Sequence, residues 1–433
     1  MQIANTVGVV GLGYVGLTLA VTLARKGFTV HGVDTSPAVL DGLAHGRPHL
    51  FEPGVEEGVR AFLGERLHAA GRLPEGGVEA AIICVSTPVD PATQSPQLDN
   101  LRAAARHVAE RSGPDTLVVV RSTVPVGASR SIVLPELLAR WGRARLAFAP
   151  ERTIQGQALR ELEELPQVVG GLDTPSLEAA SALFARVTRR VVPVSSLEAA
   201  ELVKLVNNCH TDLIYSYGNE VALMAESWRL DPLEVIRAAN LEYPRPDLAK
   251  PGFVGGACLS KDPYILMSAS RAAGYTPWLV GQARGLNERL PGHVAERLIE
   301  TIRAARGRAE GARLSVLGWA YKGWPPTDDM RGTPIVSMLP LLRAAGLELR
   351  GHDYLVAPAV IRELGAEPVS AEGAFEGADA VLVITNHPEY AKLDLPRLLP
   401  QLRRPAVIYD CWRILDEETV RGAGVAYAGI GYA

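Results

Sequence analysis

The stretch Thr6-Val-Gly-Val-Val-Gly-Leu-Gly-Tyr-Val-Gly16 decides the fold of this chain. It begins with a short β-branched run, which favours a strand, and it continues into closely spaced glycines, which favour a tight turn. Leu17–Lys26 then has helical character, and Gly27 marks its C-terminal end. A strand, a glycine turn and a helix in this order predict the first unit of an α/β domain with a parallel sheet.

The spacing Gly11-x-Gly13-x-x-Gly16 also predicts a cofactor. The first glycine permits the turn, the second lets the backbone approach a pyrophosphate, and the third allows close packing of helix on strand. The N-terminus of the helix offers free N–H groups to the phosphates. A second strand, expected over Phe28–Val33, ends at Asp34, whose carboxylate would bind the ribose 2′-hydroxyl and repel a 2′-phosphate. The sequence therefore predicts NAD rather than NADP.

The rest of the chain falls into a long α/β region, a helical region and a second α/β region. Alternating strands and helices predict a parallel sheet covered on both faces. A helical pattern runs from Leu197 to about Ala239 and again over Asp262–Arg306. The predicted domains are residues 1–195, 196–306 and 307–433. Further strands are expected at Ala80–Val85, Thr116–Val120, Arg145–Ala149, Gln167–Val169, Leu314–Leu317, Glu348–His352, Ala380–Ile384 and Ala406–Tyr409, with a helix at Pro334–Ala344.

The composition excludes several classes of protein. Its 433 residues are 47% hydrophobic and 21% charged, which is typical of a globular chain with two or three domains. A net charge of -4 gives no electrostatic reason to expect nucleic acid or an anionic membrane surface as a partner. No apolar run is long enough for a membrane span, and the N-terminus lacks the features of a signal peptide. We therefore expect a soluble, cytoplasmic protein.

The four cysteines are widely separated and form no C-x-x-C pair, which argues against a zinc site or a disulfide scaffold. One of them lies in Gly255-Gly-Ala-Cys258-Leu-Ser-Lys261-Asp262. The glycines allow a ligand close to the backbone, and a nearby cation favours the nucleophilic thiolate. Asp262 could orient a water molecule or accept a proton. The segment therefore predicts a nucleophilic Cys258.

A second candidate for catalysis lies on the helix expected after Leu197. Lys204 and Asn208 are four residues apart and so share a helix face, from which both could donate hydrogen bonds to a developing oxyanion. Cys209 follows Asn208 and is expected to pack in the interior. We expect no metal site in the chain.

Several further segments stand in order along the chain with those already described: Gly11–Gly16, Cys84–Pro88, Ser122–Gly127, Pro150–Arg152, Glu201–Asn208, Gly255–Asp262 and Leu317–Lys322, with Asp329 and Arg331. In this order and spacing they resemble the UDP-glucose/GDP-mannose dehydrogenase family over almost the whole chain. The resemblance implies two Rossmann-like, doubly wound parallel-sheet domains joined by a central helical dimerisation domain, and a homodimer or dimer-based oligomer. It also implies oxidation of the C6 alcohol of a nucleotide sugar to a carboxylate, with two NAD and a cysteine-bound thiohemiacetal and thioester.

The resemblance also implies roles for individual residues. Cys258 would be the nucleophile, Lys204 and Asn208 would stabilise the oxyanion, and Asp262 would act with water. Thr123 and Glu151 would also handle water and protons. The cofactor would be bound by the three glycines and Asp34, together with Tyr14, Val15, Thr87, Thr123 and Lys261. The UDP-sugar would be bound by Glu151, Arg152, Lys204, Asn208, Arg245, Gly255, Lys322 and Arg331.

Three departures from the family pattern affect substrate contacts more than the chemistry. Ser260 replaces a common proline, the loop Pro251–Gly256 is one residue shorter than in many relatives, and Lys322–Asp329 lacks the usual asparagine. Arg152 resembles the branch that acts on UDP-N-acetylhexosamines, such as UDP-N-acetylmannosamine or UDP-N-acetylglucosamine. UDP-glucose remains an alternative substrate. A two-electron dehydrogenase of the 3-hydroxyacid type and a non-catalytic NAD-binding protein remain alternatives of other classes.

Overall fold

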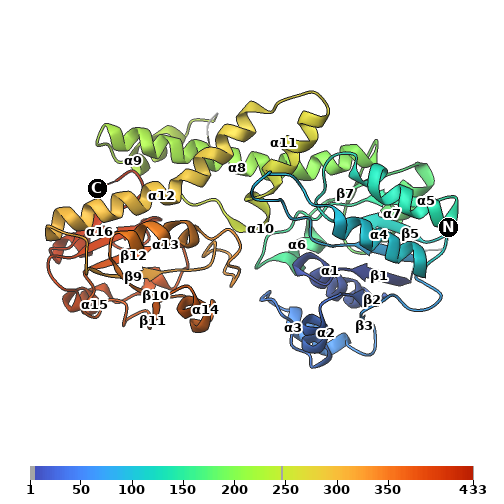
Figure 1. The fold of residues 1–433 in the computed structure, drawn as a ribbon, viewed down its shortest axis with the longest axis horizontal. Coiled ribbons are helices and arrows are strands. Elements are labelled where there is room, and N and C mark those ends of the chain that lie inside the picture. The colour runs from blue at the N-terminus through green and yellow to red at the C-terminus, as the bar shows by residue number, and fades with distance from the viewer. Residues whose placement is uncertain (1–4, 245–246, 433) are drawn as a thin grey trace. The chain divides into compact units, whose positions relative to one another are not determined.

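A computed structural model describes residues 5–244 and 247–432. They divide into two compact units, which are described separately: an N-terminal unit, up to Asn208 with Tyr264–Pro277, and a C-terminal unit, Cys209–Pro263 with the chain from Trp278 onward. The long helix α8 contributes residues to both units, so the unit boundaries differ from the three domains predicted from the sequence, which remain a prediction. Figure 1 follows the chain from blue at the N-terminus to red at the C-terminus.

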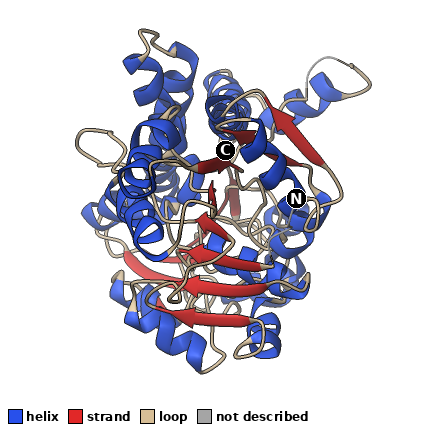
Figure 2. Ribbon diagram, turned by 90° about the vertical axis from the view of Figure 1, so that its right-hand side faces the viewer, coloured by secondary structure: helices blue, strands red, loops and turns tan. Residues whose placement is uncertain are grey.

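The N-terminal unit is built on an eight-stranded sheet in the order β3-β2-β1-β4-β5-β6-β7-β8. Its strands carry apolar residues on both faces, so that Val7 and Val9 of β1 join one hydrophobic cluster and Val10 joins another. Helices cover both faces, as Figure 2 shows with the strands in red and the helices in blue. The strands are β1 (Thr6–Val10), β2 (Thr29–Val33), β3 (Leu67–Ala70), β4 (Ala80–Ile83), β5 (Leu117–Val120), β6 (Arg145–Phe148), β7 (Gln167–Gly171) and β8 (Val191–Val194).

This sheet is not entirely parallel. Strand β7 runs antiparallel to β6, whereas β8 runs parallel to β7. The first six strands keep the order of a dinucleotide-binding fold, with β1 at the point where the strand order reverses. The helices of the unit are α1 (Tyr14–Arg25), α2 (Pro37–Ala44), α3 (Val55–Phe62), α4 (Asp99–Arg111), α5 (Leu134–Trp141, preceded by a π-helical turn, Ser129–Val133), α6 (Ala158–Glu164) and α7 (Thr174–Phe184).

The middle of the chain contains more helices than the two predicted from the sequence. The first predicted helix is divided because Asp231 caps a new helix, its side chain accepting a hydrogen bond from Leu233 N at 2.9 Å, with Pro232 in the first turn. The second is divided at Gly274, which has a positive φ of 88°. The resulting helices are α8 (Leu197–Ser227), α9 (Pro232–Asn240), α10 (Gly256–Leu259), α11 (Asp262–Ala272) and α12 (Trp278–Arg306).

The C-terminal unit contains a second sheet of six strands, in the order β11-β10-β9-β12-β13-β14. All of its strand pairs are parallel, and the order repeats that of the first six strands of the N-terminal sheet. The strands are β9 (Arg313–Leu317), β10 (Glu348–His352), β11 (Glu367–Pro368), β12 (Ala380–Val383), β13 (Val407–Asp410) and β14 (Ala426–Ala428). The helices that flank them are α13 (Pro334–Ala344), α14 (Pro358–Glu363), α15 (Leu395–Leu398) and α16 (Glu417–Gly422), with short 3-10 turns at Tyr390–Lys392 and Leu399–Gln401.

Candidate active site

The glycine turn between β1 and α1 has the shape that the sequence predicts. Gly11 has a positive φ of 94°, and a Cβ on Gly16 would lie 1.8 Å from the Gly11 carbonyl oxygen, so both positions exclude a side chain. A Cβ on Gly13 would meet no heavy atom within 4 Å, which leaves open space beside the backbone there. No side chain caps the first turn of α1, whose N–H groups can therefore face a phosphate. These features fit the pyrophosphate of NAD.

Asp34 lies just beyond the carboxyl end of β2, directed at the glycine turn. Its Oδ2 accepts a hydrogen bond from Leu12 N at 2.9 Å, and its Oδ1 accepts one from Ser36 N at 2.8 Å. Each carboxylate oxygen has a second acceptor site, so these bonds orient the group without using up its capacity. The position and charge of Asp34 fit the ribose 2′-hydroxyl of NAD.

Replacing Asp34 with asparagine should change the cofactor preference. The amide keeps an acceptor for Leu12 N but removes the charge that repels a 2′-phosphate. We expect NAD to bind roughly tenfold more weakly and the preference over NADP to narrow, since a hydrogen bond to a charged group contributes about 1.5–3 kcal/mol. Titration of both cofactors against Asp34→Asn measures the change, with exposed Asp41→Asn as the control. An unchanged NAD/NADP ratio would show that Asp34 is not the ribose ligand.

Two loops at the carboxyl edge of the N-terminal sheet are held together by side chains. Thr87 Oγ1 donates to the carbonyl oxygen of Thr123 at 2.6 Å. Glu201, buried on α8, accepts from Gly127 N at 2.5 Å and Ser129 N at 2.9 Å. Burial raises the pKa of the Glu201 carboxyl, although its hydrogen bonds oppose that shift. Thr87 thus ties the backbone at Thr123 to the loop after β4, and Glu201 binds Gly127 and Ser129 of the same connection as a supporting residue.

Lys204 is buried, in contrast to the solvated lysine that its residue type alone suggests. Its Nζ lies 3.7 Å from Oε2 of Glu151, and only 6% of the Lys204 side chain and 11% of the Glu151 side chain are exposed. Asn208 follows one turn later on α8 and is half-buried. A buried charge is retained in a protein where it is paired, so the two groups predicted to handle protons and oxyanions form one ionic site in the N-terminal unit.

The glycine turn is also tied to the loop that follows Glu151. The hydroxyl of Tyr14 donates to the buried carboxylate of Glu52. Glu52 in turn accepts from Gly156 N at 2.6 Å and Ala158 N at 2.7 Å. The Tyr14 side chain is therefore engaged by Glu52, a residue that no sequence motif marked. The guanidinium of Arg152 bonds to the carbonyl oxygen of Pro166.

In the C-terminal unit, Cys258 lies on the short helix α10 and its residue is exposed, whereas the other three cysteines are buried. Burial raises the pKa of Cys84 to about 12 and that of Cys209 to about 12, and it raises the pKa of Cys411 well above its usual value. A buried, protonated thiol is a poor nucleophile. Exposure therefore singles out Cys258 among the four.

The residues after Cys258 form a close ion pair. Lys261 Nζ lies 2.8 Å from Oδ1 of Asp262, whose side chain is fully buried. Because Asp262 neutralises it, the Lys261 ammonium provides less support for a thiolate than an isolated cation would.

The β9–α13 connection packs against the glycines that precede the thiol. A Cβ on Gly256 would lie 2.7 Å from the ring of Tyr321, and a Cβ on Gly255 would lie 2.1 Å from the carbonyl oxygen of Gly332. These glycines are therefore needed for close approach between two backbone segments. Arg331, adjacent to Gly332, binds Asp329 through two guanidinium nitrogens at 2.9 and 2.7 Å. Lys322 Nζ lies 5.6 Å from the centre of the Tyr321 ring.

Arg245, predicted to reach the substrate, lies outside the described residues. The N-terminal unit contains the glycine turn, Asp34, Thr87, Thr123, Glu151, Arg152, Lys204 and Asn208. The C-terminal unit contains Gly255, Cys258, Lys261, Asp262, Lys322 and Arg331.

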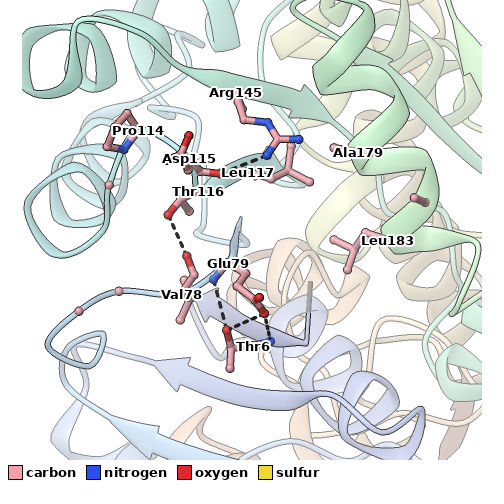
Figure 3. A pocket seen from close by; sticks show the side chains of 14 residues that line it. Thr6, Val78, Glu79, Pro114, Asp115, Thr116, Leu117, Arg145, Ala179 and Leu183 are labelled. Carbon is pink, nitrogen blue, oxygen red and sulfur yellow. Dashed lines mark hydrogen bonds between the residues drawn. The ribbon is translucent and has the colours of Figure 1, made fainter. Parts of the chain in front are cut away.

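A hollow of about 490 Å³ in the N-terminal unit is not the catalytic site. Figure 3 shows it lined by Thr6, Glu79 and Arg145, which lie at or just before the amino ends of their strands. Ligands of open α/β sheets bind at the opposite, carboxyl edge. The Glu79 carboxylate is also engaged by the backbone N–H groups of Asn5 and Thr6 at 2.6 and 2.8 Å.

Across residues 5–244 and 247–432, no helix is long and apolar enough to cross a membrane. The same residues contain no group of three or more histidine, cysteine, aspartate or glutamate side chains placed to hold a metal ion.

The fold and the site together define an NAD-dependent dehydrogenase. The fold contributes two Rossmann-like sheets and a helical middle, and the site contributes a dinucleotide turn with an acidic ribose ligand, a buried lysine–carboxylate pair and an exposed cysteine. The chain belongs to the UDP-glucose/GDP-mannose dehydrogenase family. The family's NAD binding domain matches residues 5–188, its central domain matches residues 198–289, and its UDP binding domain matches residues 315–417. The protein is therefore a nucleotide-sugar dehydrogenase, and the 3-hydroxyacid and non-catalytic alternatives are set aside.

Several relatives are similar over nearly their full length. The UDP-N-acetyl-D-mannosamine dehydrogenase of Pyrococcus horikoshii is 32% identical, with 98% of this chain and 99% of the relative covered. Its solved structure superimposes with a TM-score of 0.88 over 98% of this chain and 99% of that one. A UDP-glucose dehydrogenase from Pyrobaculum islandicum is 28% identical, with a TM-score of 0.84 over 100% of this chain and 98% of that one. An NDP-N-acetyl-D-galactosaminuronic acid dehydrogenase from Ralstonia nicotianae is 31% identical, with 91% and 93% covered.

Proposed function

We propose that this protein oxidises the C6 alcohol of a UDP-N-acetylhexosamine to the carboxylate, with UDP-N-acetylmannosamine as the first candidate substrate. The observation that carries the choice of sugar is the 32% identity to the UDP-N-acetyl-D-mannosamine dehydrogenase of Pyrococcus horikoshii over 98% of this chain. UDP-N-acetylglucosamine is the second candidate from the same class. UDP-glucose is the weaker alternative, since the UDP-glucose dehydrogenase of Pyrobaculum islandicum is 28% identical.

In this proposal NAD binds at Gly11, Gly13, Gly16 and Asp34, and when bound it accepts a hydride from C6 in each of two successive oxidations, the second with a fresh NAD. The Cys258 thiolate adds to the aldehyde carbon of the half-oxidised sugar and forms a thiohemiacetal. Loss of the second hydride leaves a thioester, and water then releases the carboxylate and the thiol. A covalent intermediate divides one difficult oxidation into easier steps, and the aldehyde stays bound to the enzyme between them.

The other residues would supply charge and protons. Lys204 and Asn208 would stabilise the oxyanions of the two tetrahedral adducts, since donors aimed at a developing negative charge in a dry site lower the barrier most. Glu151, beside Lys204, and Asp262, beside Lys261, would handle protons and the attacking water, together with Thr123. Lys322 and Arg331 would bind the diphosphate with charge-assisted hydrogen bonds.

We further infer that the protein works in the cytoplasm as a homodimer or a dimer-based oligomer, and that its uronic acid product feeds surface polysaccharide or glycan synthesis. Several large apolar side chains on and near α8 and α9 are exposed in the single chain, which supports burial against a second copy. These side chains are Leu202, Val206, Tyr217, Trp228, Leu230 and Leu241.

A panel of nucleotide sugars tests the choice of substrate. NADH formation is measured with UDP-N-acetylmannosamine, UDP-N-acetylglucosamine, UDP-glucose and GDP-mannose under identical conditions. We expect kcat/KM for a UDP-N-acetylhexosamine to exceed that for UDP-glucose by at least about tenfold, because a site built to hydrogen-bond a group discriminates against a substrate that lacks it. A higher kcat/KM for UDP-glucose would overturn the assignment of the sugar, and no NADH with any of the four would overturn the activity.

A further inference from the structure

The segment that carries Cys258 is hydrogen-bonded to a buried arginine from α12. Arg284 is only 2% exposed. Its Nη1 donates to the carbonyl oxygen of Leu259 at 2.9 Å, and its Nη2 donates to that of Val254 at 3.4 Å. One guanidinium therefore bonds the backbone four residues before Cys258 and one residue after it.

Arg284 is itself held by α8. Its Nη1 also donates to Oδ1 of Asp212 at 2.8 Å, and both side chains of this ion pair are almost completely buried. Asn287, one turn after Arg284 on α12, donates to the same Asp212 oxygen and to the Asp212 carbonyl oxygen, both at 2.9 Å. A planar guanidinium with five N–H donors can serve a carboxylate and two carbonyls at once. The position of Arg284 is therefore set by both long helices.

The start of the segment is fixed by the same network. Asn219 on α8 donates to the carbonyl oxygen of Gly252 at 2.9 Å, and its own side-chain oxygen accepts from Gly252 N at 2.8 Å. Asn219 also donates to the side-chain oxygen of Asn287 at 2.9 Å. The backbone from Gly252 to Leu259 is thus bonded at three residues to a buried polar network.

This network can satisfy the backbone of the segment and can also hold the nucleophile in place. Apart from the short helix α10, the segment has no regular secondary structure, so its carbonyl groups must find partners elsewhere. A nucleophile must also be held close to its attack geometry, and a misplacement of about 1 Å can cost about 10²-fold in rate. The network supplies partners for the carbonyl groups of Gly252, Val254 and Leu259, and it ties this backbone to both long helices.

We propose that Arg284 is a positioning residue for the nucleophile, fixing the backbone on both sides of Cys258 so that the thiol meets the C6 aldehyde in a reactive geometry. The proposal rests on the proposed function, because it takes Cys258 as the nucleophile. It assigns Arg284 no contact with the sugar or with NAD. Its loss should therefore lower kcat while the affinity for NAD stays unchanged.

Two variants test the role. Arg284→Gln combined with Asp212→Asn removes both charges together and leaves no unpaired buried ion. Arg284→Lys keeps the charge opposite Asp212, but an ammonium cannot reproduce the fork of a guanidinium. Arg297→Gln is the matched control, because Arg297 lies on the same helix outside this network and its partly exposed guanidinium pairs with Glu226 and Glu300. For each we measure kcat, the thermal melt and the stoichiometry and Kd of NAD binding by calorimetry.

We expect kcat to fall about 10–100-fold in the neutral double variant and about tenfold in Arg284→Lys. NAD stoichiometry and Kd should stay within twofold of wild type in both, and Arg297→Gln should match wild type. A loss of folded protein would instead lower the NAD stoichiometry in parallel with kcat. Wild-type kcat in the folded double variant would overturn the proposal, and if that variant does not fold, wild-type kcat in Arg284→Lys would do so.

The outcome for Arg284 is separable from that for the proposed function. If Cys258→Ser keeps its turnover, the thioester mechanism fails whatever Arg284 does. If Cys258→Ser is inactive while the Arg284 variants match wild type, only the positioning role fails.

Discussion

Cys258→Ser should lower the production of carboxylate by on the order of 10³-fold or more, which is the scale seen when an enzyme loses its covalent nucleophile. A serine hydroxyl is not ionised near neutral pH and is a much weaker nucleophile than a thiolate, so neither the covalent adduct nor the acyl intermediate should form at a useful rate. Steady-state NADH formation with the best sugar of the panel measures the loss.

The control for this substitution is Cys209→Ala, because Cys209 is buried on α8 and has no proposed role in the chemistry. We expect its turnover to stay near that of wild type and NAD to bind normally in both variants. Alkylation with iodoacetamide should modify Cys258 and spare the three buried thiols. Wild-type carboxylate production by Cys258→Ser would remove this residue from the mechanism.

Lys204→Met should lower kcat by roughly 10²–10³-fold, the range found when one donor to a developing oxyanion is removed. The effect should fall on kcat, because the lysine is assigned to the adducts formed during the reaction and not to NAD. Since the change leaves Glu151 buried without its cation, the thermal melt and NAD binding of Lys204→Met are measured alongside kcat to separate lost catalysis from lost stability.

Lys26→Met is the matched control, because Lys26 forms a half-exposed ion pair with Glu163 at 2.6 Å. Pairs of this kind contribute at most about 1 kcal/mol, so kcat should be unaffected. A folded Lys204→Met enzyme whose kcat lies within a few-fold of wild type would contradict the role given to Lys204.

The parts of the fold that follow from local sequence were predictable. The range Thr6–Val10 predicted for the first strand agrees with the structure, since its β-branched run and the glycines after it both act over a few residues. The predicted start of the following helix was wrong by three residues, because α1 begins at Tyr14, inside the glycine motif. The ends of helices depend on single capping residues such as Asp231. The spacing of apolar residues does not reveal such caps, so it predicted one long helix in place of two.

The antiparallel direction of β7 was not predicted from the sequence, for a different reason. An alternating pattern of strands and helices favours parallel pairing, and nothing in Gln167–Gly171 itself marks the strand as antiparallel to β6. Whether a strand is parallel to its neighbour is decided by the path of the connecting chain, which a local pattern does not contain.

Part of the candidate site could also be predicted from the sequence. Cys258 was selected by the glycines and charges beside it, and its exposure agrees with that selection. Glu52 and Arg284 could not be selected in this way, since each acts on backbone groups far away in sequence. Arg284 bonds to Leu259, 25 residues before it, and Glu52 bonds to Ala158, 106 residues after it. Supporting residues of this kind become visible only when packing brings distant segments together.

The central claim is that one sulfur holds a sugar between two oxidations. The most direct test is the ratio of NADH formed to sugar consumed, measured to completion with a limiting amount of the preferred UDP-sugar and with the product identified by mass spectrometry. The account predicts two NADH and one carboxylate for each sugar, with no free aldehyde. One NADH for each sugar, with an aldehyde or ketone as the product, would contradict it.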